Sequence, residues 1–348
     1  QGVDWEYYRK VYEKYLPYIN NNFDFAEMLS EMLGELNASH TGCRYYASGA
    51  TLSTAALGVF LDPSYEGDGL KIKEIIKRGP FAVKKNEVTP GSIIEKIDGT
   101  DIKAGEDYNA LLDGKAGKNI RLTIKNAKGK RFDLTIKAIS QGAQQELLYK
   151  RWVDRNRAIV DSVSHGRIAY VHVKAMNSES FRTVYSELLS EKNRTKDAVI
   201  VDERHNGGGW LHDDLCTLLS GKQYQEFVPH GKVVGKDPFN KWTKPSCVLI
   251  CEDDYSNGHG FPWVYKELGI GKLIGAPVAG TMTAVWWETL MDRSLVFGIP
   301  QVGCRDMRGT FGENTTLQPD IEVYNSPEDY ITGHDTQLIR AVEEMMKK

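Results

Sequence analysis

Three consecutive glycines, residues 207–209, follow an apolar run at residues 198–201. Glycine permits unusual backbone angles and the close approach of a ligand. Backbone N–H groups near the start of a helix can stabilise a developing negative charge. The pattern fits an oxyanion site and a flexible turn equally well. It excludes a phosphate-binding P-loop, because no Lys-Ser/Thr pair ends the stretch.

A second candidate is Ser256, which stands in a polar turn soon after the apolar run at residues 248–251. A nucleophile needs this kind of exposure, and the backbone N–H of the next residue, Asn257, can serve as an oxyanion donor. Most Ser-Asn-Gly triplets are simple turns, however, so residues 256–258 taken alone favour a turn.

A histidine and a glutamate stand in two further polar stretches. His40 lies in the turn-like stretch 37–42 and could act as a general base, although a lone histidine is more often structural or exposed. Glu313 lies in the glycine-containing stretch 308–321, where an isolated glutamate is usually solvated. None of the four stretches establishes a function alone, so the evidence lies in their combination.

Together the four stretches resemble the tricorn protease family, a tail-specific (C-terminal processing) group within peptidase family S41. Residues 36–40 resemble the family pattern that ends in Ser-His, and residues 202–209 resemble its Asp-x-Arg-x-Asn-Gly-Gly-Gly segment. Residues 255–258 stand where the nucleophile turn lies, and residues 313–323 resemble the closing Glu-Asn…Pro-Asp-Ile-Glu-Val. The order and wide spacing agree over nearly the whole chain, which is far more specific than any single motif.

The resemblance implies a serine peptidase that cleaves oligopeptides or unfolded polypeptides through an acyl-enzyme. Ser256 would be the nucleophile, and His40 would take its proton and return it to the leaving amine. Ser39 and Glu313 would orient the histidine and complete a Ser-His-Ser-Glu tetrad. Every part that acyl transfer needs is thereby assigned.

The same resemblance assigns the oxyanion donors to the backbone N–H groups of Gly208 (or Gly207) and Asn257. Tricorn has an acidic residue where this chain has Asn257, a departure that bears on substrate preference. Relatives that use a Ser–Lys pair have a lysine in the region corresponding to residues 281–287. This chain has none there, which favours the histidine-based variant.

Three segments must position these residues. Residues 1–54 carry His40 and show apolar side chains at three- and four-residue steps, which predicts helices over 5–15 and 23–36, with Asp24 as an N-cap. Residues 140–348 alternate apolar runs with helical patterns, which is typical of a parallel α/β sheet. The expected elements here are strands at 168–173, 198–201, 248–251 and 272–274 and helices at 144–162 and 335–346. The family's core is of the crotonase-like (ClpP/crotonase) kind.

The middle segment, residues 55–139, predicts short alternating strands and resembles an inserted, β-rich PDZ-like domain. Residues 89–99 resemble a conserved PDZ stretch that ends in Asn-Gly. The peptide-binding loop would be similar to the Gly-Leu-Gly-Phe carboxylate loop and consist of Leu57, Gly58, Val59 and Phe60. We expect this domain to bind extended peptides, and a packing spacer is the alternative.

Composition and charge exclude several classes of binding partner. The net charge is only −3, so we expect no nucleic-acid surface, and no apolar run is long enough for a membrane span. The five cysteines include no CxxC pair, so we expect neither a structural zinc site nor any other metal or cofactor. Peptides or polypeptides are the expected substrates. The resemblance further implies a homo-oligomer, and β-propeller domains upstream if the chain is the C-terminal part of a longer product.

Two other functions compete with the peptidase. The first is a catalytically inactive protein that binds peptides or other ligands on the same scaffold, and the four intact chemical positions argue against it. The second is a metallo-hydrolase, which the sequence disfavours because its eight histidines include no His-Glu-x-x-His pair.

Overall fold

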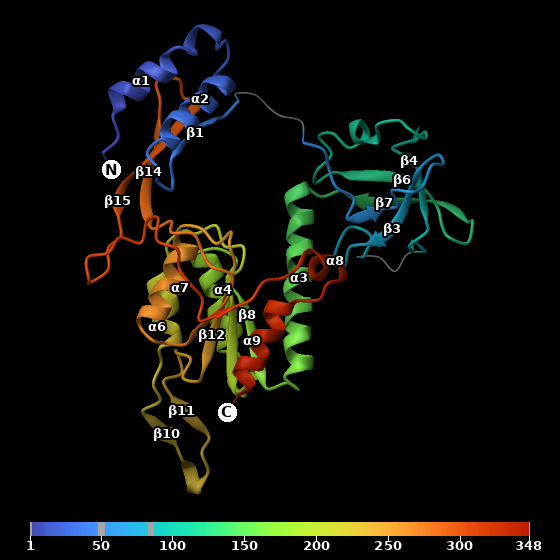
Figure 1. Cartoon of the computed structure of the whole chain (residues 1–348). Helices are drawn as coiled ribbons and strands as arrows, with labels where there is room; N and C mark the ends of the chain where they lie inside the picture. The colour runs from blue at the N-terminus through green and yellow to red at the C-terminus, as the bar shows by residue number, and fades with distance from the viewer. Residues whose placement is uncertain (1, 48–52, 83–86, 348) are drawn as a thin grey trace. The chain divides into compact units, whose positions relative to one another are not determined.

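The computed structural model describes residues 2–47, 53–82 and 87–347, which form two compact units (Figure 1). The larger unit combines Gln1–Ser48 with Asn156–Lys348, and the smaller unit is Gly49–Arg155. The larger unit therefore joins two segments that the intervening unit separates in sequence. Within the described residues, no helix is both long and apolar enough to cross a membrane.

A parallel sheet forms the centre of the larger unit, with the strand order β16-β13-β12-β9-β8. The strands that were predicted are confirmed to within two residues. Their side chains are buried throughout β8, β9 and β12, as expected for a parallel sheet with both faces covered. The strand bounds are β8 (Ile168–His172), β9 (Ala198–Asp202), β12 (Ser246–Ile250), β13 (Lys272–Gly275) and β16 (Ile321–Glu322).

Helices cover this sheet. Helix α9 (Thr336–Met346) packs on strands β8, β9, β12 and β13. Helix α4 (Ser178–Leu188) packs on the edge strand β8, helix α7 (Asn257–Glu267) packs on β13, and α6 (His212–Leu219) contacts both of these helices. Alternate strand residues such as Val201 and Ile250 join Leu215 and Phe261 in one core. The predicted terminal helix is confirmed, and the larger unit also contains two short helices, α5 (Glu191–Arg194) and α8 (Pro327–Thr332).

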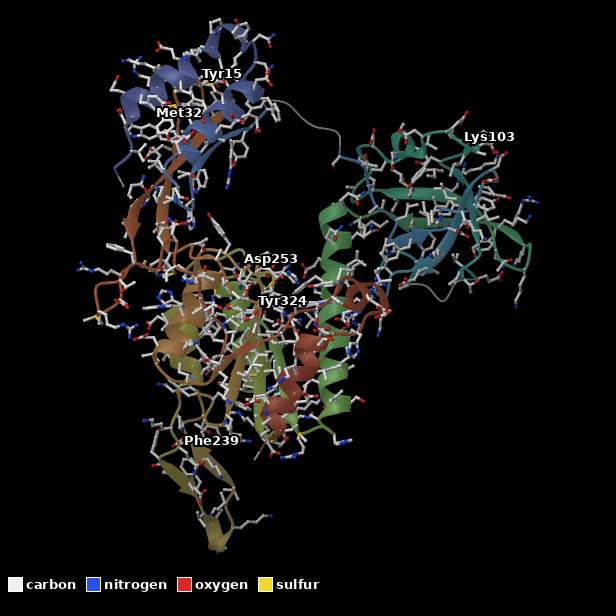
Figure 2. All side chains as sticks on the ribbon, in the orientation of Figure 1. Tyr15, Met32, Lys103, Phe239, Asp253 and Tyr324 are labelled. Carbon is white, nitrogen blue, oxygen red and sulfur yellow. The ribbon has the colours of Figure 1, made fainter. Side chains whose placement is uncertain are left out.

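The carboxyl ends of parallel strands meet at one edge of a sheet, where ligand sites commonly form. The loop after β9 holds residues 203–209, the loop after β12 leads to residue 256, and the loop after β13 holds residues 276–282. Asp253, in the second of these loops, is labelled at this edge in Figure 2. The sheet therefore brings the glycine loop and the serine turn together.

The N-terminal segment consists of α1 (Trp5–Glu13), the 3-10 turn η1 (Leu16–Tyr18) and α2 (Asn22–Gly34), where Figure 2 labels Tyr15 and Met32. Its helices are confirmed, but the predicted N-cap at Asp24 is wrong. The side chain of Asn21 caps α2 instead, by accepting a hydrogen bond from the Asp24 N–H at 2.9 Å. Asn is as good a cap as Asp, and it stands one turn earlier.

A small antiparallel sheet, which the sequence did not predict, connects this segment to the rest of the larger unit. Strand β1 (Gly42–Tyr45) pairs with β15 (Leu295–Gly303), which pairs with β14 (Thr283–Thr289). A second unpredicted hairpin, β10 (Gln225–Phe227) and β11 (Gly235–Asp237), is joined by η3 (Pro229–Gly231) and followed by Phe239, labelled in Figure 2.

The smaller unit is an antiparallel sheet with the order β2-β3-β4-β6-β7, and β5 pairs with β4. It has its own buried apolar core, which includes Ile72, Ile94 and Leu122. Helix α3 (Gln141–Val163) begins in this unit and ends in the larger one, close to the predicted range 144–162. The other bounds are β2 (Val59–Leu61), β3 (Leu70–Ile75), β4 (Ile93–Ile97), β5 (Thr100–Asp101), η2 (Tyr108–Leu111), β6 (Asn119–Lys125) and β7 (Arg131–Lys137).

Candidate active site

Ser256 stands at a sharp turn between strand β12 and helix α7. Its backbone has φ 57° and ψ −120°, which is uncommon for a residue other than glycine. Its N–H donates a hydrogen bond to Thr281 Oγ1 at 2.8 Å, which helps to hold the turn. A strained strand–turn–helix of this kind exposes the side chain of a nucleophilic serine in other folds.

Ser39, His40 and Glu313 form one hydrogen-bonded chain. Ser39 Oγ lies 2.8 Å from His40 Nδ1 and donates to Glu313 Oε2 at 2.9 Å. The backbone N–H of Ser39 donates to the other carboxylate oxygen of Glu313. Thr283 Oγ1 lies 2.8 Å from Ser39 Oγ and 3.1 Å from His40 Nδ1. These contacts fix the orientation of the imidazole and favour a proton on Nδ1.

The small sheet explains why His40 lies beside residues more than 200 positions away. Gly42 pairs with Gly298, and a Cβ atom on Gly298 would approach the His40 carbonyl oxygen to 3.1 Å. The β14 partner strand begins at Thr283, which contacts the imidazole. The His40 N–H also donates to Tyr255 Oη at 2.7 Å, and the two rings lie 4.8 Å apart.

Ser256 and His40 line one cavity of about 330 Å³. Trp210, His212 and Trp263 also line it, and Trp263 is shared with a neighbouring cavity of about 360 Å³. Among the described residues no hydrogen bond joins Ser256 to His40. Catalytic hydrogen bonds are often long before substrate binds, so this geometry is compatible with a Ser–His pair.

The glycine loop packs directly against the serine turn. A Cβ atom on Gly208, whose φ is +94°, would lie 2.6 Å from Ser256 Cβ, so only glycine fits there. The Gly208 N–H donates to Asn206 Oδ1 at 2.9 Å, whereas Gly207 is exposed. Asn257 is the first residue of α7, so its N–H has no partner within the helix.

The Asn257 side chain joins two helix starts. Its Oδ1 accepts from the Leu211 N–H at 2.7 Å and the His212 N–H at 3.1 Å, at the beginning of α6. Its Nδ2 lies 2.8 Å from His212 Nδ1. The departure from tricorn at Asn257 bears on substrate preference, and in the structure the Asn257 side chain makes a positioning contact.

A buried charge network anchors the chain before the glycines. Arg204 makes ion pairs with Asp202 at 2.7 Å and with Asp335 at 2.9 Å. The Tyr170 hydroxyl donates to Asp202 at 2.8 Å. Since all these side chains are buried, removing one partner would leave an uncompensated buried charge, which is strongly destabilising.

Two opposing effects act on the His40 imidazole. Burial lowers the pKa of His40 below its ordinary value, and the negative charge of Glu313 partly opposes this. Burial is the larger effect, so the free base is favoured at neutral pH. A neutral imidazole with the proton on Nδ1 presents a lone pair on Nε2, which is the form that a general base needs.

The predicted peptide-binding loop of the smaller unit is closed. Leu57, Gly58 and Val59 are buried, and only Phe60 is partly exposed. The Gly58 N–H donates to Gln144 Oε1 at 3.0 Å. A separate cavity of about 900 Å³ lies between β7 and the first turns of α3, and the four loop residues do not line it.

Three site residues were missed from the sequence: Tyr255, Thr281 and Thr283. Thr281 and Thr283 stand in the stretch 281–287, whose lack of a lysine favoured the histidine-based variant. A hydroxyl pair spaced by one residue after a predicted strand was the available signal. The structure also brings His205, Cys251 and Asp253 together, and each offers one atom that could bind a metal ion, although no metal site was expected from the sequence.

Comparisons with known proteins follow the same division of the chain. The tricorn protease C1 domain matches residues 1–34, the tricorn protease PDZ domain matches 65–141, and peptidase family S41 matches 167–323. A crystal structure of the tricorn protease superposes with a TM-score of 0.84 at 24% identity, over 98% of this chain and 34% of that one. At this identity the likeness shows the fold.

Relatives in sequence agree over almost the full chain. A Sulfurisphaera tokodaii protein described as a tricorn-like protease C-terminal subunit is 30% identical over 99% of this chain and 41% of its own length. The tricorn protease of Thermoplasma acidophilum is 26% identical over 100% of this chain and 33% of its own length.

The matches and the fold define the class first: residues 167–323 match peptidase family S41 and residues 65–141 match a tricorn PDZ domain, so the chain is similar to an S41 peptidase that contains a PDZ domain. Within that family, the chain is similar over almost its whole length to tricorn and tricorn-like proteases. It spans 33% to 41% of the length of these two curated relatives.

Proposed function

We propose that the chain hydrolyses peptide bonds in oligopeptides or unfolded polypeptides through an acyl-enzyme on Ser256. The observation that carries this proposal is the cavity that Ser256 and His40 line together, with Ser39 and Glu313 hydrogen-bonded behind the imidazole. These groups supply the nucleophile, the base and the orienting partners that acyl transfer needs.

In the first step, His40 Nε2 takes the hydroxyl proton of Ser256 while Ser256 Oγ forms a bond to the peptide carbonyl carbon. Nδ1 keeps its proton and donates it as a hydrogen bond to Ser39 Oγ, which itself donates to Glu313. The imidazolium then protonates the leaving amine as the C–N bond breaks. Water, deprotonated by His40 in the same way, releases the acid and restores Ser256.

The carbonyl oxygen becomes negative during both steps and needs N–H donors. Asn257 supplies one from the start of α7, and the glycine loop supplies the other. Gly208 serves if its N–H turns from Asn206 Oδ1 toward the substrate, and exposed Gly207 is the alternative. Each such donor contributes roughly a hundred- to thousandfold in rate.

The finer architecture belongs to the same proposal. We assign residues 1–54 to the helical catalytic segment, 55–139 to the PDZ-like domain and 140–348 to a core of the crotonase-like kind. We also propose that the chain self-associates. The competing function is a scaffold that binds peptides without turnover, and the presence or absence of hydrolysis separates the two.

The test is Ser256→Ala. The variant should fold and show no turnover of a chromogenic peptide, because no other group replaces the nucleophile. Ser162→Ala, at an exposed position of α3, is the matched control and should cut at the wild-type rate. A Ser256→Ala protein that cuts at nearly the wild-type rate would contradict the assignment.

A further inference from the structure

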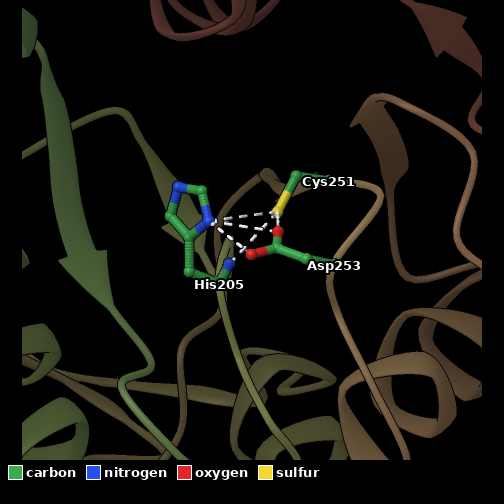
Figure 3. Close-up of side chains that lie close together, drawn as sticks. All are labelled: His205, Cys251 and Asp253. Atoms are coloured by element: carbon green, nitrogen blue, oxygen red, sulfur yellow. Dashed lines mark hydrogen bonds and ion pairs between the residues drawn. The ribbon is translucent and has the colours of Figure 1, made fainter.

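A histidine, a cysteine and a carboxylate meet at the carboxyl edge of the parallel sheet (Figure 3). His205 follows strand β9, while Cys251 and Asp253 follow strand β12. One ligand atom from each lies within 4.8 Å of the other two. The residues that line the cavity of Ser256 and His40 are different ones, so this cluster is separate from the proposed catalytic groups.

The distances between the three ligand atoms suit a small metal ion if the side chains move slightly. His205 Nδ1 lies 3.0 Å from Asp253 Oδ2 and 3.8 Å from Cys251 Sγ. The Cys251 thiol donates to Asp253 Oδ1 at 2.7 Å. Ligand atoms around tetrahedral zinc lie roughly 3.4–3.6 Å apart, given bonds of about 2.0–2.3 Å. The sulfur and carboxylate oxygen therefore need to separate by only about 1 Å.

We propose that His205, Cys251 and Asp253 bind a thiophilic divalent transition metal of the zinc class, with water in the remaining position. Thiolate, imidazole and carboxylate together suit Zn²⁺, whereas Mg²⁺ and Ca²⁺ prefer oxygen ligands alone. The ion replaces the thiol proton: the S–H bond of Cys251 breaks, a sulfur–metal bond forms, and the proton passes to solvent.

The surroundings support a bound ion. The His205 and Asp253 side chains are 50% and 65% exposed, which gives an ion a path from solvent, and Cys251 is buried beneath them. The His205 N–H donates to Cys251 Sγ at 3.1 Å, a contact of the kind that stabilises a metal-bound thiolate. Buried Asp254 accepts from the Cys251 N–H at 2.8 Å and the Asn206 N–H at 3.1 Å, which holds the two loops in register.

A metal ion at this site would affect the two loops that carry Gly208 and Ser256. Gly208 lies three residues beyond His205, and Ser256 lies three residues beyond Asp253. A metal bound by His205 on one loop and by Cys251 and Asp253 on the other would cross-link the loops that carry these two groups. The site rests on ligand geometry and not on the proposed peptidase activity, so it can be measured equally well in the Ser256→Ala protein.

The experiment titrates metal-free protein with Co²⁺, a spectroscopic substitute for Zn²⁺. We expect one Co²⁺ per chain with a thiolate-to-cobalt absorption band, which added Zn²⁺ abolishes. We also expect Zn²⁺ to raise the unfolding temperature, because the ion binds the folded state. No binding, or binding without the thiolate band, would overturn the proposal.

Two variants identify the ligands. Cys251→Ser should abolish the absorption band. His205→Asn removes the imidazole, yet asparagine tolerates the positive φ of 69° found at this position. It should weaken Zn²⁺ binding at least about a hundredfold, since loss of an outer-shell partner alone costs roughly 10- to 100-fold. His230→Asn, at an exposed histidine with φ 50°, is the matched control. Equal Zn²⁺ affinity in His205→Asn and His230→Asn would contradict the proposed ligand set.

Discussion

Each compact unit contains a loop whose sequence predicts ligand binding. The two loops differ in whether their binding groups are accessible to a ligand. In the larger unit, Ser256 and His40 line a common cavity of about 330 Å³. In the smaller unit, Gly58 is buried and its N–H is already bonded to Gln144. A motif can therefore indicate which groups bind, while the elements around it decide whether those groups are accessible.

The difference follows from what each loop packs against. The serine turn lies at the carboxyl edge of a parallel sheet, where loops end next to one another and enclose space. Gly58 packs so closely against Pro80 that a Cβ atom would lie 2.4 Å from Pro80 Cδ. The first turns of helix α3 then supply Gln144 to its N–H. The same comparison predicts large effects from substitutions in the first loop and small ones in the second.

The largest effect after loss of the nucleophile is expected when the base is removed. We choose His40→Asn because asparagine tolerates the φ of 62° at this position. Turnover should fall about a thousandfold or more, as it does when a Ser–His unit loses its base. His212→Asn, in the same cavity, is the matched control with a much smaller loss. An equal or larger loss in the control, measured as kcat, would assign the base elsewhere.

Glu313→Gln should have the next largest effect. The substitution keeps the shape of the side chain but weakens its hold on Ser39, so the imidazole loses part of its orientation. We expect kcat to fall roughly a hundredfold, the lower end of what a positioned acid–base group contributes. A rise in KM with kcat unchanged would indicate a binding role instead.

The pH profile of the same variant gives an independent readout. In the wild type, burial lowers the pKa of His40, so the acidic limb of kcat/KM should lie below the ordinary imidazole value of about 6.5. Glu313 opposes that shift. Its loss should lower the pKa of His40 further and move the limb to lower pH. A limb that moves to higher pH would show that Glu313 does not act on His40 through its charge.

The smallest effect is expected in the smaller unit, from Gln144→Ala. If the loop at residues 57–60 binds a peptide carboxylate, freeing the Gly58 N–H should tighten binding of a peptide with a free C-terminus. One hydrogen bond corresponds to roughly two- to tenfold in affinity. An amidated peptide is the control and should be unaffected. The affinities are measured by calorimetry. If Gln144→Ala changes the affinity for the two peptides equally, the loop is a packing element and does not bind the carboxylate.

The sequence predicted the central strands and long helices because their apolar patterns are local. It did not predict the β1–β15–β14 sheet, in which strands from opposite ends of the chain pair and few residues are fully buried. The Asp24 cap was wrong for a different reason: Asn21 and Asp24 are both good caps, and propensity alone does not choose between them.

At the site, the family resemblance identified the residues that lie in motifs. It did not identify the residues that long-range strand pairing brings to the site. Thr283 contacts Ser39 across 244 positions of sequence, because the small sheet places β14 beside the His40 turn. The cluster of His205, Cys251 and Asp253 was not predicted for the same reason. His205 and Cys251 are separated by 46 residues, which resembles no compact metal motif. Long-range strand pairing, which local patterns do not encode, accounts for both.

The most direct measurement of the central claim is reaction with a fluorophosphonate, followed by mass spectrometry of the labelled peptide. Ser256 Oγ should displace fluoride and form one phosphorus–oxygen bond per chain, and His40 should assist by taking the hydroxyl proton. We expect a single label on Ser256, formed at least about a hundredfold more slowly in His40→Asn. A label on a different serine, or no label on the folded protein, would contradict the assignment of Ser256 as the nucleophile.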